Sequence, residues 1–153
     1  MEGKWRKAAL FQGFTDSEIA LLQKIATHSV LNQGQIAFQE GDRGDSLIVL
    51  DFGTLQLSKS ETSGDQHVIT TLGTGDYLGE MSLFDHGKRS LSGMATERCD
   101  VTIIPFADLV PLLDSHPALA AKFYKNVSMG IARRLRNVSG DIAFLRTYLK
   151  RRD

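Results

Sequence analysis

An arginine and a serine that follow a glycine–glutamate pair form the part of this sequence best suited to bind a small anion. Arg89 and Ser90 come nine and ten residues after Glu80. Gly79 leads into a possible helical turn over residues 80–84, whose first backbone N–H groups lack intrahelical partners and can point at an anion. Arg89 can donate two parallel hydrogen bonds to phosphate oxygens. Ser90 can add another donor and Glu80 can accept from a sugar hydroxyl, so the pattern suits a ligand with both a phosphate and a sugar.

Adjacent arginine and serine residues are most often solvated surface, so this spacing alone leaves a simpler interpretation open. A catalytic or metal-binding β-barrel of the cupin type is a further alternative, and such a site needs closely spaced histidines with a carboxylate nearby. The histidines of this chain are scattered, at positions 28, 67, 86 and 116. The single cysteine, Cys99, cannot form an internal disulfide. The sequence therefore predicts neither an enzyme nor a metal site.

The composition is that of one globular domain. The 153 residues are 42% apolar and 24% charged, as in ordinary soluble proteins. Eighteen basic residues balance eighteen acidic ones, so the overall charge favours neither a nucleic-acid-wrapping protein nor a membrane-surface protein. The first ten residues contain no apolar run resembling a signal peptide, and apolar windows elsewhere are too short to cross a bilayer. We therefore expect a cytoplasmic protein without a membrane span.

Three zones must position the candidate residues, and the period of the apolar residues changes between them. Thr15 and Glu18 have the spacing of a capping box, and apolar residues follow at helical intervals, so a short helix ending near Thr27 is expected. From residue 28 to 105, short apolar or alternating runs are separated by glycine and aspartate. This rhythm is typical of antiparallel hairpins in a sandwich or barrel. The predicted strands cover residues 36–38, 47–52, 55–57, 68–72 and 101–104.

After Pro105 the helical period returns. A short helix over residues 108–113 is expected, and Pro117 fits the first turn of a longer one. Apolar residues of the longer helix then recur at alternating intervals of four and three, which is the heptad spacing of a coiled coil. We expect the helix before this seam to pack on the chain's own barrel, and the seam to pair with a second chain, with Gly140 weakening or bending it. The seam residues are Ile131, Leu135, Val138, Ile142, Leu145 and Leu149.

The segment around Gly79 resembles the phosphate-binding cassette of the cyclic nucleotide-binding domain family. The motif reads Leu-Gly-Glu-Met-Ser-Leu over residues 78–83 and Lys-Arg-Ser over residues 88–90. The resemblance extends over about residues 14–144 and implies the family's fold, a β-roll flanked by helices. In the family, the glycine and glutamate contact the ribose, the arginine neutralises the cyclic phosphate and the next residue adds a hydrogen bond. Lys88 replaces the family's usual proline, which leaves the loop before Arg89 less preorganised.

The long helix resembles the dimer helix of bacterial catabolite activator regulators. The matching stretch is Ala-Arg-Arg-Leu over residues 132–135, followed by Ser139. In that subfamily, residues of this helix reach the nucleotide base, including one serine from the partner chain. The resemblance assigns these roles to Arg134 and Ser139, with a solvated helix face as the alternative for the arginines. Val138 stands where the subfamily has a base-contacting threonine.

These expectations combine into a non-catalytic cyclic nucleotide sensor that binds cyclic AMP rather than cyclic GMP and needs no cofactor. The expected fold class is mainly β with flanking helices (α+β), an antiparallel β-roll of jelly-roll type with an N-terminal helix and a long C-terminal helix. We expect one domain over residues 1–153, divided into an N-terminal helical segment (about 1–27), the β-roll (28–105) and C-terminal helices (106–153), with no DNA-binding domain. The predicted ligand-binding residues are Gly79, Glu80, Met81, Ser82, Arg89, Ser90, Arg134 and Ser139.

Two kinds of partner are expected for such a sensor. One is a second copy of the chain and the other is a downstream protein that the sequence does not identify. The competing hypothesis is a β-roll that serves protein–protein interaction and no longer binds nucleotide. The expected dimer contacts are Ile131, Leu135, Val138, Ile142 and Leu145.

Overall fold

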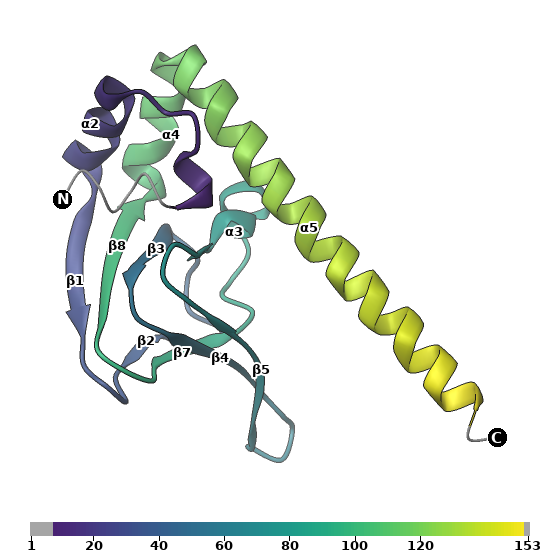
Figure 1. Ribbon diagram of the computed structural model, residues 1–153. Helices are drawn as coiled ribbons and strands as arrows, with labels where there is room; N and C mark the ends of the chain where they lie inside the picture. Colours follow the sequence, from purple (N-terminus) through teal and green to yellow (C-terminus); the bar gives the residue numbers. More distant parts are fainter. Residues whose placement is uncertain (1–7, 152–153) are drawn as a thin grey trace.

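Two four-stranded antiparallel sheets form the centre of the protein, whose computed structural model describes residues 8–151 (Figure 1). The first sheet has the strand order β1-β8-β3-β6 and the second β2-β7-β4-β5. Helices lie before and after the sheets in the chain, which confirms the predicted β-roll with flanking helices. The strands are β1 (Thr27–Leu31), β2 (Ile36–Phe38), β3 (Ser46–Phe52), β4 (Leu55–Ser60), β5 (Gln66–Leu72), β6 (Tyr77–Leu78), β7 (Ser92–Ala95) and β8 (Cys99–Pro105). The helices are η1 (Ala9–Phe11), α2 (Asp16–Ile25), α3 (Glu80–Asp85), α4 (Phe106–Ser115) and α5 (Pro117–Lys150).

Strand β3 is buried on both faces, which explains its nearly continuous apolar sequence. Successive side chains of a strand point to opposite faces of the sheet. Leu47 and Val49 pack in a first core with the helices, whereas Ile48 and Leu50 pack in a second core between the two sheets. Strand β3 thus contributes to both cores. Its first residue, Ser46, accepts a hydrogen bond from Arg89 in the site described below.

Three strands lie outside the sequence prediction: β1, β6 and β7. Strand β1 is mostly polar, yet it pairs with β8 over five residues. Strand β7 contains Gly93, where a Cβ atom would lie 2.6 Å from the ring of Phe38. Strand β6 consists of Tyr77 and Leu78, which pair with Val49 and Ile48. Pairing with neighbours defines these strands, and apolar periodicity does not reveal such pairing.

The predicted helices are present, with ends shifted by a few residues. The capping box is formed, because the Glu18 N–H donates to Thr15 Oγ1 (3.2 Å) and the Thr15 N–H donates to Glu18 Oε2 (2.9 Å). Helix α4 is longer than predicted at both ends, and Pro117 occupies the first turn of α5 as expected. Helix α5 continues through Gly140 to Lys150 without interruption. Residues 1–7 and 152–153 of the predicted helical segments lie outside the described residues.

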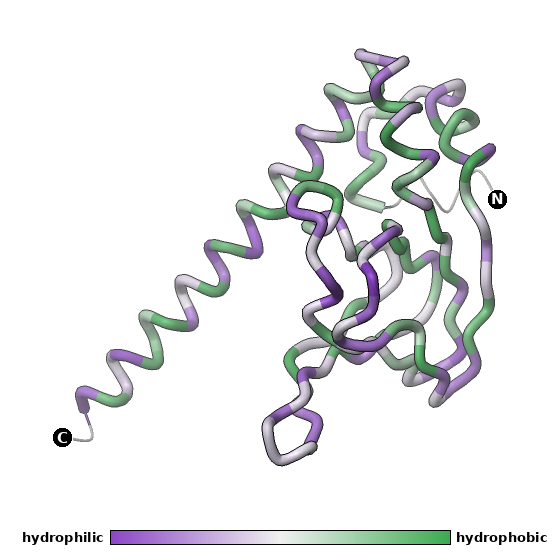
Figure 2. Tube along the Cα trace, turned by 180° about the vertical axis from the view of Figure 1, so that it is seen from behind, coloured by the Kyte–Doolittle hydropathy of each residue, from purple (hydrophilic) through white to green (hydrophobic). Residues whose placement is uncertain are grey.

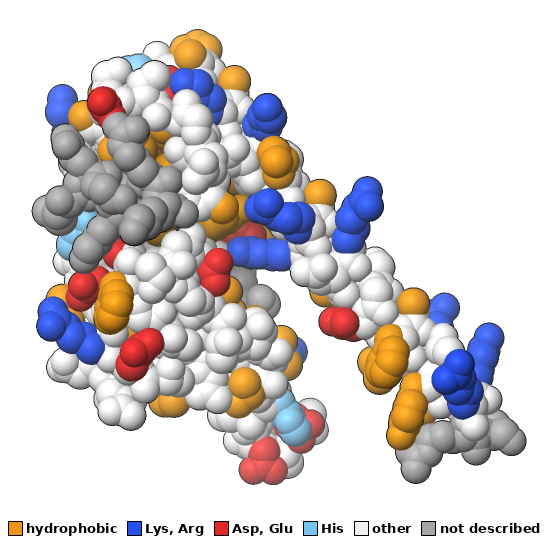
Figure 3. Space-filling model, in the orientation of Figure 1, with side chains coloured by type: hydrophobic (Ala, Val, Ile, Leu, Met, Phe, Trp, Pro, Cys, Tyr) orange, Lys and Arg blue, Asp and Glu red, His pale blue; other side chains and the backbone are white. Residues whose placement is uncertain are grey.

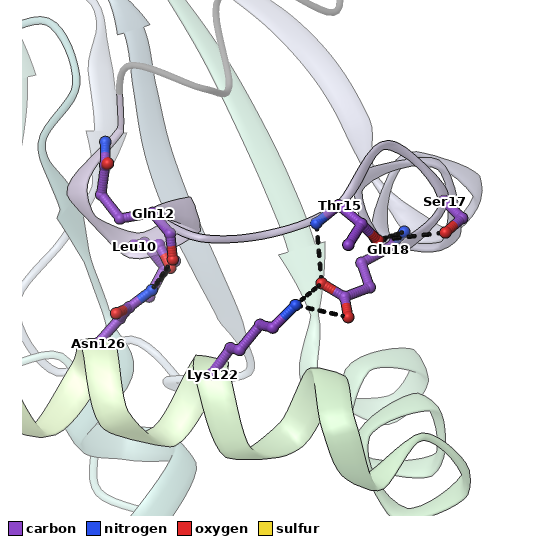
Figure 4. Close-up of polar contacts among 7 residues, drawn as sticks. All are labelled: Leu10, Gln12, Thr15, Ser17, Glu18, Lys122 and Asn126. Carbon is purple, nitrogen blue, oxygen red and sulfur yellow. Dashed lines mark hydrogen bonds and ion pairs between the residues drawn. The ribbon is translucent and has the colours of Figure 1, made fainter.

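The N-terminal half of α5 is held firmly against the segments that open the chain (Figure 4). Lys122 Nζ donates to both carboxylate oxygens of Glu18 (3.0 and 2.9 Å). Asn126 Nδ2 donates to the backbone carbonyls of Leu10 (2.8 Å) and Gln12 (3.0 Å). Apolar side chains of the same half lie in the first core. This part of α5 is therefore fixed relative to the roll.

Beyond residue 131, α5 projects away from the roll (Figure 1). Every residue from 132 to 151 is exposed, and apolar residues recur along the projecting part (Figure 2). Ile131 packs against the first core, whereas the seam residues that follow it are between 48% and 63% exposed. Lys and Arg side chains are spread along this helix and acidic side chains over the roll (Figure 3). The charged residues of the projecting part are Arg133, Arg134, Arg136, Asp141, Arg146, Lys150 and Arg151.

Candidate functional site

Gly79 forms the turn between β6 and α3, and only glycine fits this position. Its φ is +95°, in the left-handed region that other residues rarely adopt. A Cβ atom here would overlap Arg89 Nη1 and lie 2.6 Å from the carbonyl oxygen of Ser46. The glycine therefore lets the turn bend and lets the arginine approach the backbone. The predicted helical turn follows as α3, from Glu80 to Asp85.

Arg89 is buried and oriented by contacts on several sides. Its Nη2 donates to the carbonyl (2.8 Å) and hydroxyl (3.2 Å) of Ser46, and its Cζ lies 5.5 Å from the centre of the Phe38 ring. Its backbone N–H donates to the Asp42 carbonyl (2.8 Å). Burial lowers the pKa of the Arg89 guanidinium, and the carboxylates of Asp45, Asp42 and Glu80 oppose that shift. A guanidinium is not deprotonated in proteins, so the Arg89 side chain stays charged at neutral pH.

Two of the predicted site residues each have a buried polar atom that lacks a hydrogen-bond partner among residues 8–151. One is Arg89 Nη1, a donor, and the other is Glu80 Oε2, an acceptor. Arg89 is 7% exposed and Glu80 is 1% exposed. Leaving a buried polar group unpaired costs about 1–3 kcal/mol, and more when the group is charged. These two atoms are complementary to a ligand with an anionic group and a hydroxyl. The anionic group would accept from Arg89 Nη1, and the hydroxyl would donate to Glu80 Oε2.

Arg134 of α5 completes this side of the site. Its Nη1 donates to Glu80 Oε1, and its Nη2 donates to the carbonyl of Tyr77 (2.7 Å). The guanidinium carbon lies 5.2 Å from the centre of the Tyr77 ring. The sequence predicted a contact of Arg134 with the nucleotide base, and the structure places the Arg134 guanidinium on the Glu80 carboxylate. Tyr77 was not among the predicted site residues.

Seven of the eight predicted residues line one cavity of about 230 Å³. Ser139 does not line it, because its side chain is exposed on the projecting helix and donates to the carbonyl of Leu135 (2.9 Å). Met81 is 62% exposed and lies at the rim. The cavity also has an apolar wall that sequence reasoning missed. The wall residues are Phe38, Leu57, Leu78 and Leu91.

The signal for this wall was partly visible in the sequence. Phe38 and Leu57 lie within two of the predicted strands, but the pattern could not show which side of each strand faces a ligand. Two larger hollows, of about 460 and 650 Å³, lie elsewhere on the molecule. Neither is lined by Glu80 or Arg89, so of these three cavities the smaller one contains the two buried site atoms that lack hydrogen-bond partners.

Comparison with known proteins gives this arrangement a family. A family model described as "Cyclic nucleotide-binding domain" matches residues 29–116. The chain belongs to this family. A Cyclic AMP receptor protein of Thermus thermophilus is 30% identical over 136 residues, which make up 89% of this chain and 61% of that protein. The chain thus spans about three fifths of the length of this relative.

Solved structures show the same fold. The N-terminal domain of a transcriptional regulator from Streptomyces coelicolor is 31% identical, with a TM-score of 0.73 over 88% of this chain and 94% of that one. A cyclic nucleotide-binding domain from Methylobacillus flagellatus is 26% identical, with a TM-score of 0.80 over 92% of this chain and 79% of that one. The match to the family model includes the cassette from Gly79 to Ser90 but ends before α5. The cyclic nucleotide-binding domain match therefore does not extend to Arg134 and Ser139.

Two kinds of feature are absent from residues 8–151. No group of three or more histidine, cysteine, aspartate or glutamate side chains is arranged to hold a metal ion. No helix in the same part of the chain is long and apolar enough to span a bilayer.

Proposed function

We propose that this protein is a non-catalytic sensor that binds a cyclic nucleotide in the cavity between α3, Arg89 and α5. The observation that carries the proposal is the pair of unpaired buried atoms, Arg89 Nη1 and Glu80 Oε2. A cyclic phosphate would accept from the guanidinium, and a ribose hydroxyl would donate to the carboxylate. Gly79, Met81, Ser82 and Ser90 would supply the remaining polar contacts. The apolar wall would face the sugar and the base.

We infer that cyclic AMP is preferred over cyclic GMP. The support is the 30% identity to a protein named for cyclic AMP, together with the likeness of α5 to the helix of the catabolite activator type. A cytoplasmic location and a single domain over residues 1–153 belong to the same proposal. A downstream protein would receive the signal.

We further propose that two copies associate in parallel through the projecting half of α5. The described seam residues beyond Ile131 are exposed, and large apolar residues so exposed along one stripe need a partner. In a parallel two-stranded coil, a residue at a g position faces the partner's e position five residues further on. Arg134 and Ser139 have this relation, so the partner subunit's Ser139 would face Arg134 and approach the cavity. Asp141 and the partner subunit's Arg146 would form an ion pair in the same way. The proposed dimer contacts within the seam are Ile131, Leu135, Val138, Ile142 and Leu145.

Binding would be relayed because one helix carries both the site contact and the seam. The ribose hydroxyl would share the Glu80 carboxylate with Arg134, and α5 would close over the base. A ligand shifts such an equilibrium only by its different affinity for the two arrangements. Amide hydrogen exchange of residues 124–145 should therefore slow on binding. Identical exchange with and without ligand would exclude the relay and leave binding alone.

The decisive experiment is a calorimetric titration with cyclic AMP and cyclic GMP. Arg89→Ala should weaken binding by about 2–5 kcal/mol, which is roughly 30-fold to several thousand-fold. Arg98→Ala is the matched control, because the Arg98 side chain is 69% exposed and lies outside the cavity lining. 2′-Deoxy cyclic AMP should also bind more weakly, since it leaves Glu80 Oε2 unpaired. Equal affinities for Arg89→Ala and the wild type would contradict the proposed phosphate contact.

A β-roll that only binds other proteins is the second candidate. Two observations favour it: Lys88 replaces the proline that rigidifies the cassette, and Arg134 already pairs with Glu80. A thermal-shift assay separates the two candidates. A ligand at about 100 times its dissociation constant stabilises the folded state by about 2.7 kcal/mol. The interaction module would show no shift with either nucleotide.

A further inference from the structure

Helix α5 comes very close to the roll at Gly130. This residue is buried, and a Cβ atom added to it would overlap the hydroxyl oxygen of Tyr77 and lie 3.4 Å from its Cζ. Glycine inside a helix is less favourable than alanine by about 0.8–1.0 kcal/mol. The backbone of Gly130 is in ordinary helical structure, so the absence of a side chain serves the close approach.

The Tyr77 ring cannot move aside easily. It is 5% exposed and packs in the first core with Phe123 and Val127. Its backbone is paired with Val49 on strand β3. Burial, with a smaller effect from the nearby Glu80 carboxylate, raises the pKa of the Tyr77 phenol, so the hydroxyl stays neutral at physiological pH. The hydroxyl is thus a fixed surface against which α5 rests.

The same tyrosine connects this contact to the ligand site. Arg134 lies one helical turn after Gly130 and therefore on the same face of α5. Its guanidinium stacks on the Tyr77 ring and donates to the Tyr77 carbonyl and to Glu80. Any displacement of α5 from Tyr77 would draw Arg134 away from both acceptors.

We propose that the contact between the Tyr77 hydroxyl and Gly130 sets the depth of α5 over the cavity, so that Arg134 reaches Glu80. Tyr77 and Gly130 act as positioning residues. Arg134 holds one oxygen of the Glu80 carboxylate and leaves the other turned toward a ligand hydroxyl. The consequence for affinity rests on the proposed function, whereas the consequence for the helix position does not.

The test uses Gly130→Ala with a compensating second change. The single variant should displace α5, speed amide hydrogen exchange in residues 124–134 of the free protein, and weaken cyclic AMP binding at least ten-fold. Adding Tyr77→Phe removes the hydroxyl that the new methyl group meets, so the double variant should regain most of this affinity and the slow exchange. Gly140→Ala is the matched control, because a Cβ atom there meets nothing within 4 Å. It should leave affinity and exchange in residues 124–134 unchanged.

Several outcomes would overturn the proposal. Gly130→Ala with wild-type affinity and exchange would show that the contact does not set the helix position. A double variant as impaired or as unfolded as Gly130→Ala would show that the hydroxyl is not the obstacle. If the wild type binds neither nucleotide, the proposed function fails, and the exchange measurements on the three variants still decide the positioning role.

Discussion

The two halves of α5 belong to one uninterrupted helix but are stabilised in different ways. Residues 117–131 bury Leu119, Phe123, Val127 and Gly130 and are tied by polar contacts to the start of the chain. Residues 132–150 are all exposed, and within them Arg134 donates hydrogen bonds to Glu80 and Tyr77 of the roll. Helices in proteins gain most of their stability from packing an apolar face. The first half therefore belongs to the fold, and the second half is available to respond to a ligand and a partner.

The largest expected effect is on the free energy of unfolding, and it is seen by comparing one substitution in each half of α5. Phe123→Ala should lower the free energy of unfolding by about 3–5 kcal/mol, because the ring is fully buried. Phe144→Ala also removes a phenyl ring, but from a position that is 70% exposed. This substitution should change the free energy of unfolding by less than about 0.5 kcal/mol. Urea denaturation followed by circular dichroism, at one protein concentration, measures both. Equal losses would mean that the second half is packed as tightly as the first.

A charged residue introduced into the seam should weaken dimerisation and leave the fold of each subunit unchanged. Leu145→Glu would bury a carboxylate between two helices and weaken dimerisation by about 3 kcal/mol or more, roughly 100-fold. Thr147→Glu makes a similar charge change on the outer face of the same helix and should leave the dimer intact. Sedimentation equilibrium distinguishes the two variants. A dimer that tolerates Leu145→Glu would place the interface elsewhere.

The smallest of these effects concerns the Lys122–Glu18 pair in the first half. Lys122→Ala should cost about 1 kcal/mol of stability, since the pair is charge-assisted but partly exposed. Lys125→Ala, on an exposed position of the same helix, should cost almost nothing. Chemical denaturation at neutral pH measures both variants.

The effect of Lys122 should also depend on pH. Hydrogen bonds from Lys122 and from the Thr15 backbone lower the pKa of Glu18 from its ordinary value. A carboxyl with a depressed folded-state pKa stabilises the fold above its unfolded pKa, about 4.3, and this contribution is lost as pH falls through the folded pKa. The stability difference between wild type and Lys122→Ala should therefore shrink below about pH 4. A difference that stays constant down to pH 2 would exclude the ion pair as its cause.

Local patterns predicted the elements whose cause is local. The Thr15–Glu18 capping box, the strand over residues 47–52 and the turn at Gly79 each follow from residues close in sequence. Other features depend on contacts between distant segments, which the period of apolar residues does not reveal. Examples are the pairing of polar β1 with β8 and the packing of Phe38 and Leu57 in one core. The contact of Arg134 could not be predicted for the same reason, because its hydrogen-bond partner Glu80 lies 54 residues away in the sequence. The resemblance named Arg134, and only the packing of α5 on Tyr77 shows where its side chain goes.

The charge of the projecting helix has a consequence for ionic strength. Residues 132–151 carry six basic side chains and one acidic one, although the whole chain is balanced. Two such helices side by side would repel each other, and this repulsion extends over roughly the Debye length, about 10 Å at 0.1 M salt. Added salt screens it, so association through this helix should tighten as salt rises, whereas a dimer held mainly by ion pairs would loosen. Sedimentation at low and high sodium chloride would show which force dominates.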